Sequence, residues 1–160
     1  MKYILVTGAM GQVGVELTQA LRDRYGADNV IATGYNNRPA NESQWDNPYY
    51  PLDIRDAVLL NKIIEEHQCD TIFHLAALLS AVAESRPLEA WDINMNGLIN
   101  VLEVARIHRC AVFFPSSIGA FGPETPAFDT PQDTLQRPKS LYGITKVSGE
   151  LLCDYYFHHF

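Results

Sequence analysis

Short apolar segments alternate with longer amphipathic ones along the whole chain, and this alternation limits the fold more than any other feature. Nearly continuous apolar runs, typical of strands buried on both faces of a parallel sheet, occupy residues 2–7, 29–33, 71–76 and 111–117, with a weaker run, which contains Pro51, at 49–54. Apolar residues spaced for one helix face occupy residues 12–25, 57–67, 88–108 and the segment from Leu141 onwards. The pattern predicts right-handed βαβ crossovers, and therefore an α/β fold with a doubly wound parallel sheet and helices on both faces.

Charge and composition limit the classes of partner. The formal net charge is −7 and Lys and Arg form no run, so no nucleic-acid partner is predicted, because such a partner needs clustered cations. Glycines break the first apolar run well before the length of a membrane span, so no membrane association is predicted. The three cysteines contain no CxxC pair, which favours a reduced, cytoplasmic protein over a disulfide framework. His74 lies in a core strand, where a packed neutral imidazole is expected, and His158 and His159 lack a third ligand, so no metal is predicted.

A glycine-rich turn separates the first predicted strand from the first predicted helix. The segment TGAMGQVG places glycines at positions 8, 11 and 14. Gly8 and Gly11 let the backbone turn tightly and approach a pyrophosphate, whose charge meets the N–H groups of the helix N-terminus, while Gly14 lets the helix pack onto the strand. A tight turn without a ligand is the competing interpretation. The position between strand and helix favours a Rossmann-like dinucleotide-binding domain.

The end of the second predicted strand lacks the acidic residue that usually accepts from the adenosine ribose hydroxyls. Gly34 takes that position, so a 2′-phosphate would not be repelled. Arg38 can attract such a phosphate or be a solvated loop residue. Asp53 and Ile54 follow the third strand, where a carboxylate and a backbone N–H can address the adenine edge; alternatively, Asp53 caps the helix that begins at Ala57.

Tyr142 and Lys146 are four residues apart in the last predicted helix, so their side chains share one face. A phenol with a pKa near 10 is a poor base at neutral pH, and a nearby ammonium lowers that pKa by stabilising the phenolate. Ser116 and Ser117 end an upstream strand and can present a hydroxyl to the same substrate oxygen. Together these side chains suit proton transfer at a substrate oxygen.

At these motifs the chain resembles the extended short-chain dehydrogenase/reductase family: TGAMGQVG, HLAA, NMNG, SSIGAFG and YGITK occur in the family's order. The resemblance implies that Ser117, with Ser116 as the alternative, polarises the substrate oxygen and that Tyr142 is the acid/base. It implies that Lys146 binds the ribose and activates Tyr142, and that Asn94 supports the proton relay. It implies cofactor contacts from Gly8, Met10, Gly11, Gln12, Val13, Asp53, Ile54, Leu75, Ala76, Ala77, Asn94, Tyr142 and Lys146.

Two longer segments, residues 75–106 and 121–152, are similar to the short-chain-type L-threonine 3-dehydrogenases. This resemblance implies NAD-dependent oxidation of the L-threonine 3-hydroxyl to 2-amino-3-ketobutyrate. It places Leu79, Ser80 and Ala81 on the substrate side, with Ser80 donating to the amino-acid carboxylate or, alternatively, only capping a turn. The chain departs from that family at Gly34, where Asp is usual, and at Gly119, where Ala is usual; the first departure leaves NADP open beside NAD.

Two other functions remain open at this point, a nucleotide-sugar epimerase or dehydratase on the same scaffold and a non-catalytic dinucleotide-binding module. The resemblance also implies that residues 1–160 are the N-terminal, dinucleotide-binding half of a longer enzyme, without its last strands and its substrate domain. The strand at 111–117 would then lie at an open sheet edge, and the 160 residues alone are expected to be inactive. A homodimer is expected through the helices around 88–108 and 141–160.

Overall fold

The computed structural model describes residues 1–35 and 48–160 of the protein, so Arg38 lies outside the described residues. Within the described part of the chain, parallel strands form one sheet in the order β3-β2-β1-β4-β5. The strands are β1 (Ile4–Thr7), β2 (Val30–Gly34), β3 (Tyr49–Pro51), β4 (Thr71–His74) and β5 (Ala111–Phe113).

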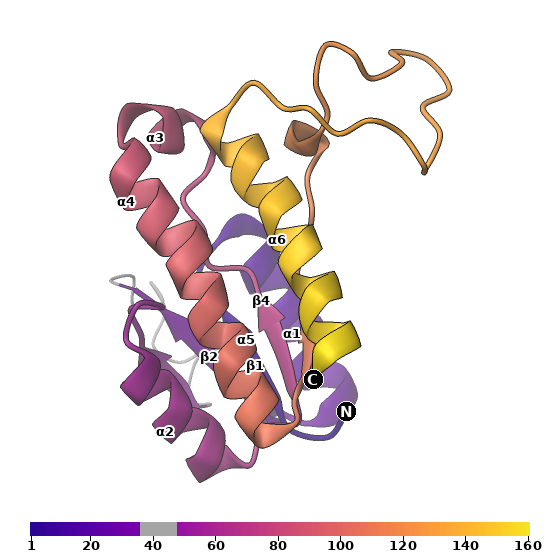
Figure 1. Ribbon diagram of the computed structural model, residues 1–160. Coiled ribbons are helices and arrows are strands. Elements are labelled where there is room, and N and C mark those ends of the chain that lie inside the picture. The colour runs from indigo at the N-terminus through magenta and orange to yellow at the C-terminus, as the bar shows by residue number, and fades with distance from the viewer. Residues whose placement is uncertain (36–47) are drawn as a thin grey trace.

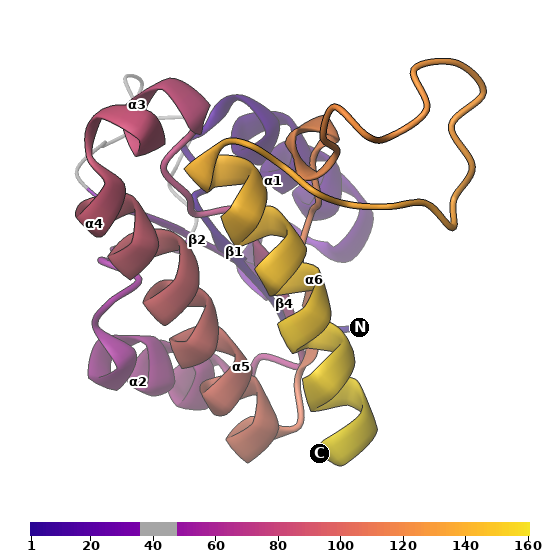
Figure 2. The same cartoon turned by 45° about the horizontal axis from the view of Figure 1, so that its top comes forward.

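Helices cover both faces of this sheet, as Figures 1 and 2 show: α2, α5 and α6 lie on one face and α1 on the other, with α5 and α6 side by side. The α-helices are α1 (Gln12–Tyr25), α2 (Ala57–His67), α3 (Ser80–Ser85), α4 (Pro87–Trp91), α5 (Gly97–His108) and α6 (Leu141–His159). Shorter turns are the 3₁₀ segments η1 (Ala27–Asn29) and η4 (Ile118–Ala120) and the π-helical segment η3 (Asp92–Asn96). The predicted α/β, doubly wound, Rossmann-like architecture is confirmed.

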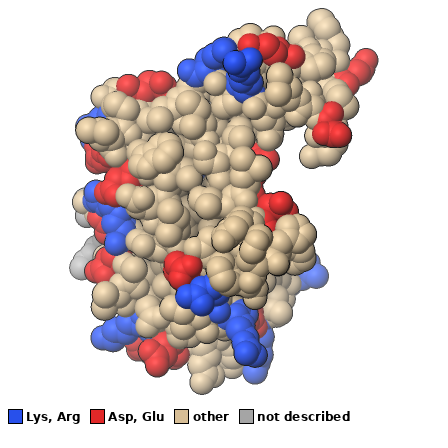
Figure 3. Space-filling model, in the orientation of Figure 1, with Lys and Arg blue, Asp and Glu red and all other residues tan. Residues whose placement is uncertain are grey.

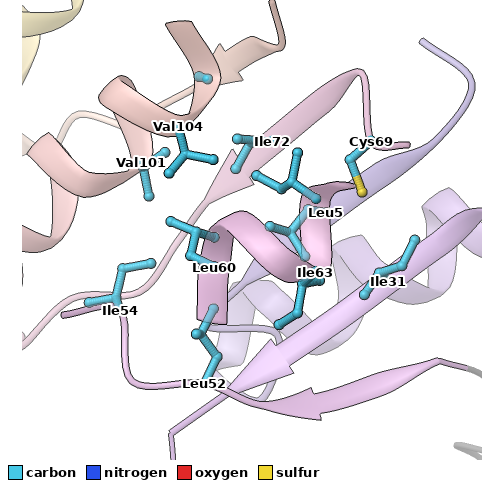
Figure 4. Packing of buried hydrophobic residues seen from close by; sticks show 12 residues of the cluster. Leu5, Ile31, Leu52, Ile54, Leu60, Ile63, Cys69, Ile72, Val101 and Val104 are labelled. Carbon is cyan, nitrogen blue, oxygen red and sulfur yellow. The ribbon is translucent and has the colours of Figure 1, made fainter. Parts of the chain in front are cut away.

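The central strands β1, β2 and β4 are buried on both faces because each side of the sheet packs against helices. Side chains alternate along β1, so Leu5 joins the cluster under α2 and α5 while Ile4 and Val6 join the cluster under α1. Figure 4 shows the first cluster, in which Leu60 and Ile63 of α2 and Val101 and Val104 of α5 meet residues of the sheet. This two-sided burial explains why the strands are continuous apolar runs in the sequence.

Strand order creates the place for a ligand. Within the sheet, β2 and β3 lie on one side of β1, and β4 and β5 lie on its other side, so the direction of strand addition reverses at β1. In open α/β sheets the crevice outside the carboxyl ends of the strands, next to such a reversal, is the usual binding position. The carboxyl ends of β1, β2, β3 and β4 lie at that edge.

Several predicted boundaries differ from the structure. The predicted strand 49–54 ends at Pro51, although the Leu52 N–H still donates to the Gly34 carbonyl over 2.9 Å, and the predicted strand 111–117 ends at Phe113. The helix predicted over 88–108 contains the π-helical turn η3, and α3 was not predicted at all. A π-turn adds one residue to a helical turn and is frequent at functional sites, but it leaves no period in the sequence.

Among the strands that the structure describes, β5 pairs only with β4 and lies at the sheet edge, as expected. Phe113 in this strand is 49% exposed. No helix in residues 1–35 and 48–160 is long and apolar enough to cross a bilayer.

Candidate active site

A cleft of about 490 Å³ opens at the carboxyl edge of the sheet. It is lined by the turn after β1, the ends of β2 and β3, and the loop after β4. Predicted cofactor residues that line it are Gly8, Met10, Gly11, Gln12, Val13, Asp53, Ile54, Leu75, Ala76 and Ala77. The sequence did not point to further lining residues, namely Tyr35, Leu52, Arg55, Leu78, Glu89 and Ile93.

The glycine turn fits a dinucleotide because two of its positions have no room for a side chain. Gly8 has φ +67°, and a Cβ there would lie 2.7 Å from the backbone nitrogen of Ala76. A Cβ at Gly14 would lie 2.3 Å from the carbonyl oxygen of Gly8. The N-cap of α1 is Gly11, which has no side chain to accept from the first N–H groups of the helix. These donors therefore suit a pyrophosphate.

Asp53 pairs with Arg55 at the rim of this cleft. Arg55 Nη2 lies 2.6 Å from a carboxylate oxygen of Asp53, and its backbone N–H donates to the same carboxylate over 3.0 Å. The side-chain hydrogen bond from Arg55 is the main reason that the pKa of Asp53 is lowered. The alternative role of Asp53 as a helix cap is wrong, because Asp56 caps α2 by accepting from the Leu59 N–H over 2.9 Å.

The side chains of Tyr142 and Ser117 both lie close to Gly119. A Cβ at Gly119 would be 3.4 Å from Cδ1 of Tyr142 and 3.5 Å from Oγ of Ser117, which are ordinary contact distances. Oγ of Ser117 also accepts from the Gly119 N–H over 3.1 Å. Ser116, the alternative serine, instead donates a short hydrogen bond to Glu150. The geometry therefore favours Ser117 as the hydroxyl beside Tyr142.

Lys146 lies one helical turn after Tyr142 and is buried. Its Nζ donates to the Pro115 carbonyl over 2.9 Å and lies 4.4 Å from the ring centroid of Phe114 and 5.6 Å from that of Tyr142. Burial lowers the pKa of Lys146. A cavity of about 10 Å³ lined by Lys146 shares Ala76 and Ala77 with the lining of the cleft.

Asn94 lies in the π-helical turn η3 and is hydrogen-bonded to two neighbouring segments. Its Oδ1 accepts from the Leu78 N–H over 2.8 Å, and its Nδ2 donates to the Leu78 carbonyl over 3.1 Å and to Thr145 Oγ1 over 3.3 Å. One buried amide therefore joins the loop after β4 to α6, beside Lys146. These hydrogen bonds connect elements of the fold, and the role of Asn94 in the proton relay stays a prediction.

The proposed substrate side follows the cleft wall. Ser80 is exposed and begins α3, but the N-cap is Leu79, so the alternative role of Ser80 as a capping side chain is not supported. Leu79 lines the cleft. Glu84 of α3, which sequence reasoning missed, accepts from the Leu141 N–H over 2.7 Å at the start of α6. The segment with Ser80 is thus attached to the helix with Tyr142.

His74 is a buried neutral imidazole, as expected, with Nδ1 2.8 Å from Thr7 Oγ1. Burial, with a smaller effect of Lys146, lowers its pKa to about 3. Within the described residues, no group of three or more His, Cys, Asp or Glu side chains could hold a metal ion.

Stability should fall in acid because of His74. The unfolded chain binds a proton near pH 6.5 and the folded chain only near pH 3, so the free energy of unfolding falls between these values as the pH is lowered. We expect protonation of His74 in the unfolded chain to lower the free energy of unfolding by roughly 2 kcal/mol when the pH is lowered from 7 to 5. Urea titrations of the wild type and of His74→Asn at both pH values measure this change. The control, His158→Asn, replaces an exposed histidine and should keep the wild-type pH dependence. The same change in the free energy of unfolding in all three proteins would contradict the prediction.

Gly119 should accept the alanine that the resemblance leads one to expect. We predict that Gly119→Ala leaves the free energy of unfolding unchanged or raises it by up to about 1 kcal/mol, because the methyl group fits and the unfolded chain loses freedom. Gly143→Ala is the matched control, since its Cβ would lie 2.1 Å from the Gly119 carbonyl oxygen and should destabilise the fold. Equal destabilisation by both changes, measured by chemical denaturation, would refute the prediction.

Comparison with known proteins assigns the family. The model described as the NAD dependent epimerase/dehydratase family matches residues 4–160. The chain belongs to this family. Membership agrees with the sequence motifs, because the glycine turn comes first and the Tyr142 and Lys146 pair last, as in the family that the sequence resembles.

Proteins similar to this chain are described with more than one activity. A Staphylococcus saprophyticus protein described as an uncharacterized epimerase/dehydratase is 52% identical over all of this chain and 50% of its own length. The X-ray structure of L-threonine dehydrogenase from Clostridium difficile is 56% identical with a TM-score of 0.96, covering 100% of this chain and 50% of that one. UDP-glucose 4-epimerase from Thermotoga maritima is 28% identical with a TM-score of 0.88, covering 98% and 52%. The chain thus spans about half the length of the relatives it matches.

Proposed function

We propose that the protein catalyses the NAD-dependent oxidation of the L-threonine 3-hydroxyl to 2-amino-3-ketobutyrate. The observation that carries this proposal is that Tyr142 and Ser117 both lie close to Gly119, while Lys146 is one helical turn from Tyr142 and lines a small cavity with Ala76 and Ala77 of the cleft wall. The chain that holds these side chains is 56% identical to an L-threonine dehydrogenase. The proton transfer follows from the chemistry of these side chains, and L-threonine as the substrate follows from the similarity to that enzyme.

Each of the three side chains has a distinct task. Tyr142 as phenolate removes the proton of the substrate hydroxyl, and the Ser117 hydroxyl donates to the same oxygen and orients it. The Lys146 ammonium stabilises the phenolate. Burial favours the neutral amine, whereas the Pro115 carbonyl and the face of Phe114 stabilise the ammonium, so Lys146 keeps its charge where the phenol needs it.

NAD, when bound, accepts the hydride from C3 of the substrate. The glycine turn and the N-terminus of α1 would hold its pyrophosphate, Asp53 and Ile54 its adenosine half, and Lys146 its second ribose. NADP remains the alternative, because position 34 has no carboxylate to exclude a 2′-phosphate.

A nucleotide-sugar epimerase is the second candidate, since a UDP-glucose 4-epimerase shares the fold. The two functions are separated by incubating the full-length product of the gene that encodes this chain with L-threonine or UDP-glucose and either NAD or NADP. We expect nicotinamide reduction with L-threonine and NAD, and no conversion of UDP-glucose. Conversion of UDP-glucose without threonine-dependent reduction would replace the proposal with the second candidate.

The proposal includes a cytoplasmic homodimer in which a substrate domain completes the site. Exposed apolar side chains on α4, α5 and α6 support the dimer, and Figure 3 shows that the face formed by α5 and α6 is largely uncharged. These side chains are Leu88, Trp91, Ile99, Ile107, Ile144, Leu151 and Tyr155. Sedimentation of the full-length gene product should give twice its monomer mass, and a monomer at micromolar concentration would contradict the dimer.

A further inference from the structure

A tyrosine hydroxyl reaches the end of β2 from the neighbouring strand. Tyr49 begins β3 and pairs with Ala32, two residues before Gly34. Its hydroxyl donates to the Gly34 carbonyl over 3.4 Å. Two residues of a strand span between 6 and 7 Å, about the length of a tyrosine side chain. The ring of Tyr49 therefore runs along the sheet toward the carboxyl edge where the cleft opens.

This hydroxyl takes the space of a side chain at position 34. A Cβ added to Gly34 would lie 2.9 Å from the Tyr49 oxygen and 3.1 Å from Cγ of Met10. Residues 32 and 34 project to the same face of the sheet, the α1 face, where Tyr49 and Met10 also pack. Gly34 and Met10 line the cleft. The Tyr49 hydroxyl thus lies directly behind the point where the wall of the cleft lacks a side chain.

The chemistry of a phenol suits this position. A carboxylate at the end of the second strand accepts from the adenosine 2′-hydroxyl and repels a 2′-phosphate. A phenol is uncharged at neutral pH and both donates and accepts hydrogen bonds. While it donates to the Gly34 carbonyl it can accept from a ribose 2′-hydroxyl, and it can donate to a 2′-phosphate by giving up that long hydrogen bond.

We propose that Tyr49 binds the adenosine 2′ position of the dinucleotide in place of the missing carboxylate, and that Gly34 is small so that the Tyr49 hydroxyl fits beside it. The inference rests on dinucleotide binding under the proposed function. The expected consequence is weak discrimination between NAD and NADP. Their dissociation constants should lie within about tenfold of each other, because no carboxylate at this point repels the 2′-phosphate of NADP.

Calorimetric titration of the full-length gene product tests the role of Tyr49. We expect Tyr49→Phe to weaken the binding of both NAD and NADP about fivefold, the effect of one neutral hydrogen bond. Tyr50→Phe is the matched control: the Tyr50 hydroxyl lies 2.7 Å from His67 Nε2, and its loss should leave both dissociation constants unchanged. An NAD analogue without the adenosine 2′-hydroxyl should bind wild type and Tyr49→Phe equally, which a purely structural role of Tyr49 would not produce.

A second variant tests the pairing of Gly34 with Tyr49. Gly34→Asp alone crowds the Tyr49 hydroxyl, whereas Gly34→Asp with Tyr49→Val should bind NAD at least tenfold more tightly than NADP. Unchanged affinities in Tyr49→Phe, or the same loss with the deoxy analogue, would overturn the inference. A wild-type protein that binds the dinucleotides but does not oxidise threonine would refute only the proposed activity, and one that binds neither would refute both.

Discussion

Replacing Tyr142 by phenylalanine is expected to lower kcat for threonine oxidation by roughly 10²–10⁴-fold while the Kd for NAD stays within about twofold. The phenol hydroxyl transfers the proton, whereas the cleft that holds the dinucleotide is built mainly from other residues. Within the described part of the chain this hydroxyl makes no hydrogen bond, so its removal should not change stability. Steady-state kinetics and calorimetry on the full-length gene product measure both quantities.

Lys146→Ala should differ from Tyr142→Phe by damaging both binding and rate. Its ammonium is expected to contact the ribose as well as to stabilise the Tyr142 phenolate, and its removal leaves the Pro115 carbonyl without its donor. Substantial activity in Tyr142→Phe, or an effect of Lys146→Ala on rate alone, would contradict the assigned roles.

Gly14→Ala is expected to have the second large effect, because it forces the phosphate-binding turn open. The added methyl group would lie 2.3 Å from the Gly8 carbonyl oxygen and 2.8 Å from the Ala9 carbonyl carbon, both in the backbone. Overpacking of this kind costs about 1–3 kcal/mol, more than the helix propensity that alanine gains over glycine. We therefore expect a lower free energy of unfolding and loss of measurable NAD binding.

Gly11→Ala is the matched control for that change. Its Cβ would lie 3.3 Å from the same Gly8 oxygen, a tight contact that a shift of a few tenths of an ångström relieves, so Gly11→Ala should lower stability much less than Gly14→Ala. Urea denaturation of the three proteins measures the comparison. Equal stability of Gly14→Ala and Gly11→Ala would mean that the turn adapts more easily than its geometry indicates.

Local patterns in the sequence were sufficient to predict the fold and part of the site. Continuous apolar runs predicted a parallel sheet covered on both faces, and the glycine spacing predicted the turn that now lines the cleft. Tyr142 and Lys146 are one helical turn apart, so their proximity followed from the helix period alone.

Contacts between distant segments could not be predicted in this way. Glu84 meets the start of α6 from 57 residues away, and Asn94 holds the loop after β4 through a π-turn that leaves no hydrophobic period. The filling of the space at Gly34 by Tyr49 depends on strand pairing in β3, whose predicted extent was wrong beyond Pro51. Such contacts are set by tertiary packing and not by local propensity.

Transfer of deuterium from C3 of L-threonine to the nicotinamide tests the central claim most directly. The full-length gene product is incubated with NAD and L-threonine deuterated at C3, and the reduced nucleotide is analysed by mass spectrometry. The account predicts reduced nicotinamide that carries one deuterium, and no such product from the Tyr142→Phe variant. Reduced nicotinamide without deuterium, or no reduction while UDP-glucose is converted, would contradict it.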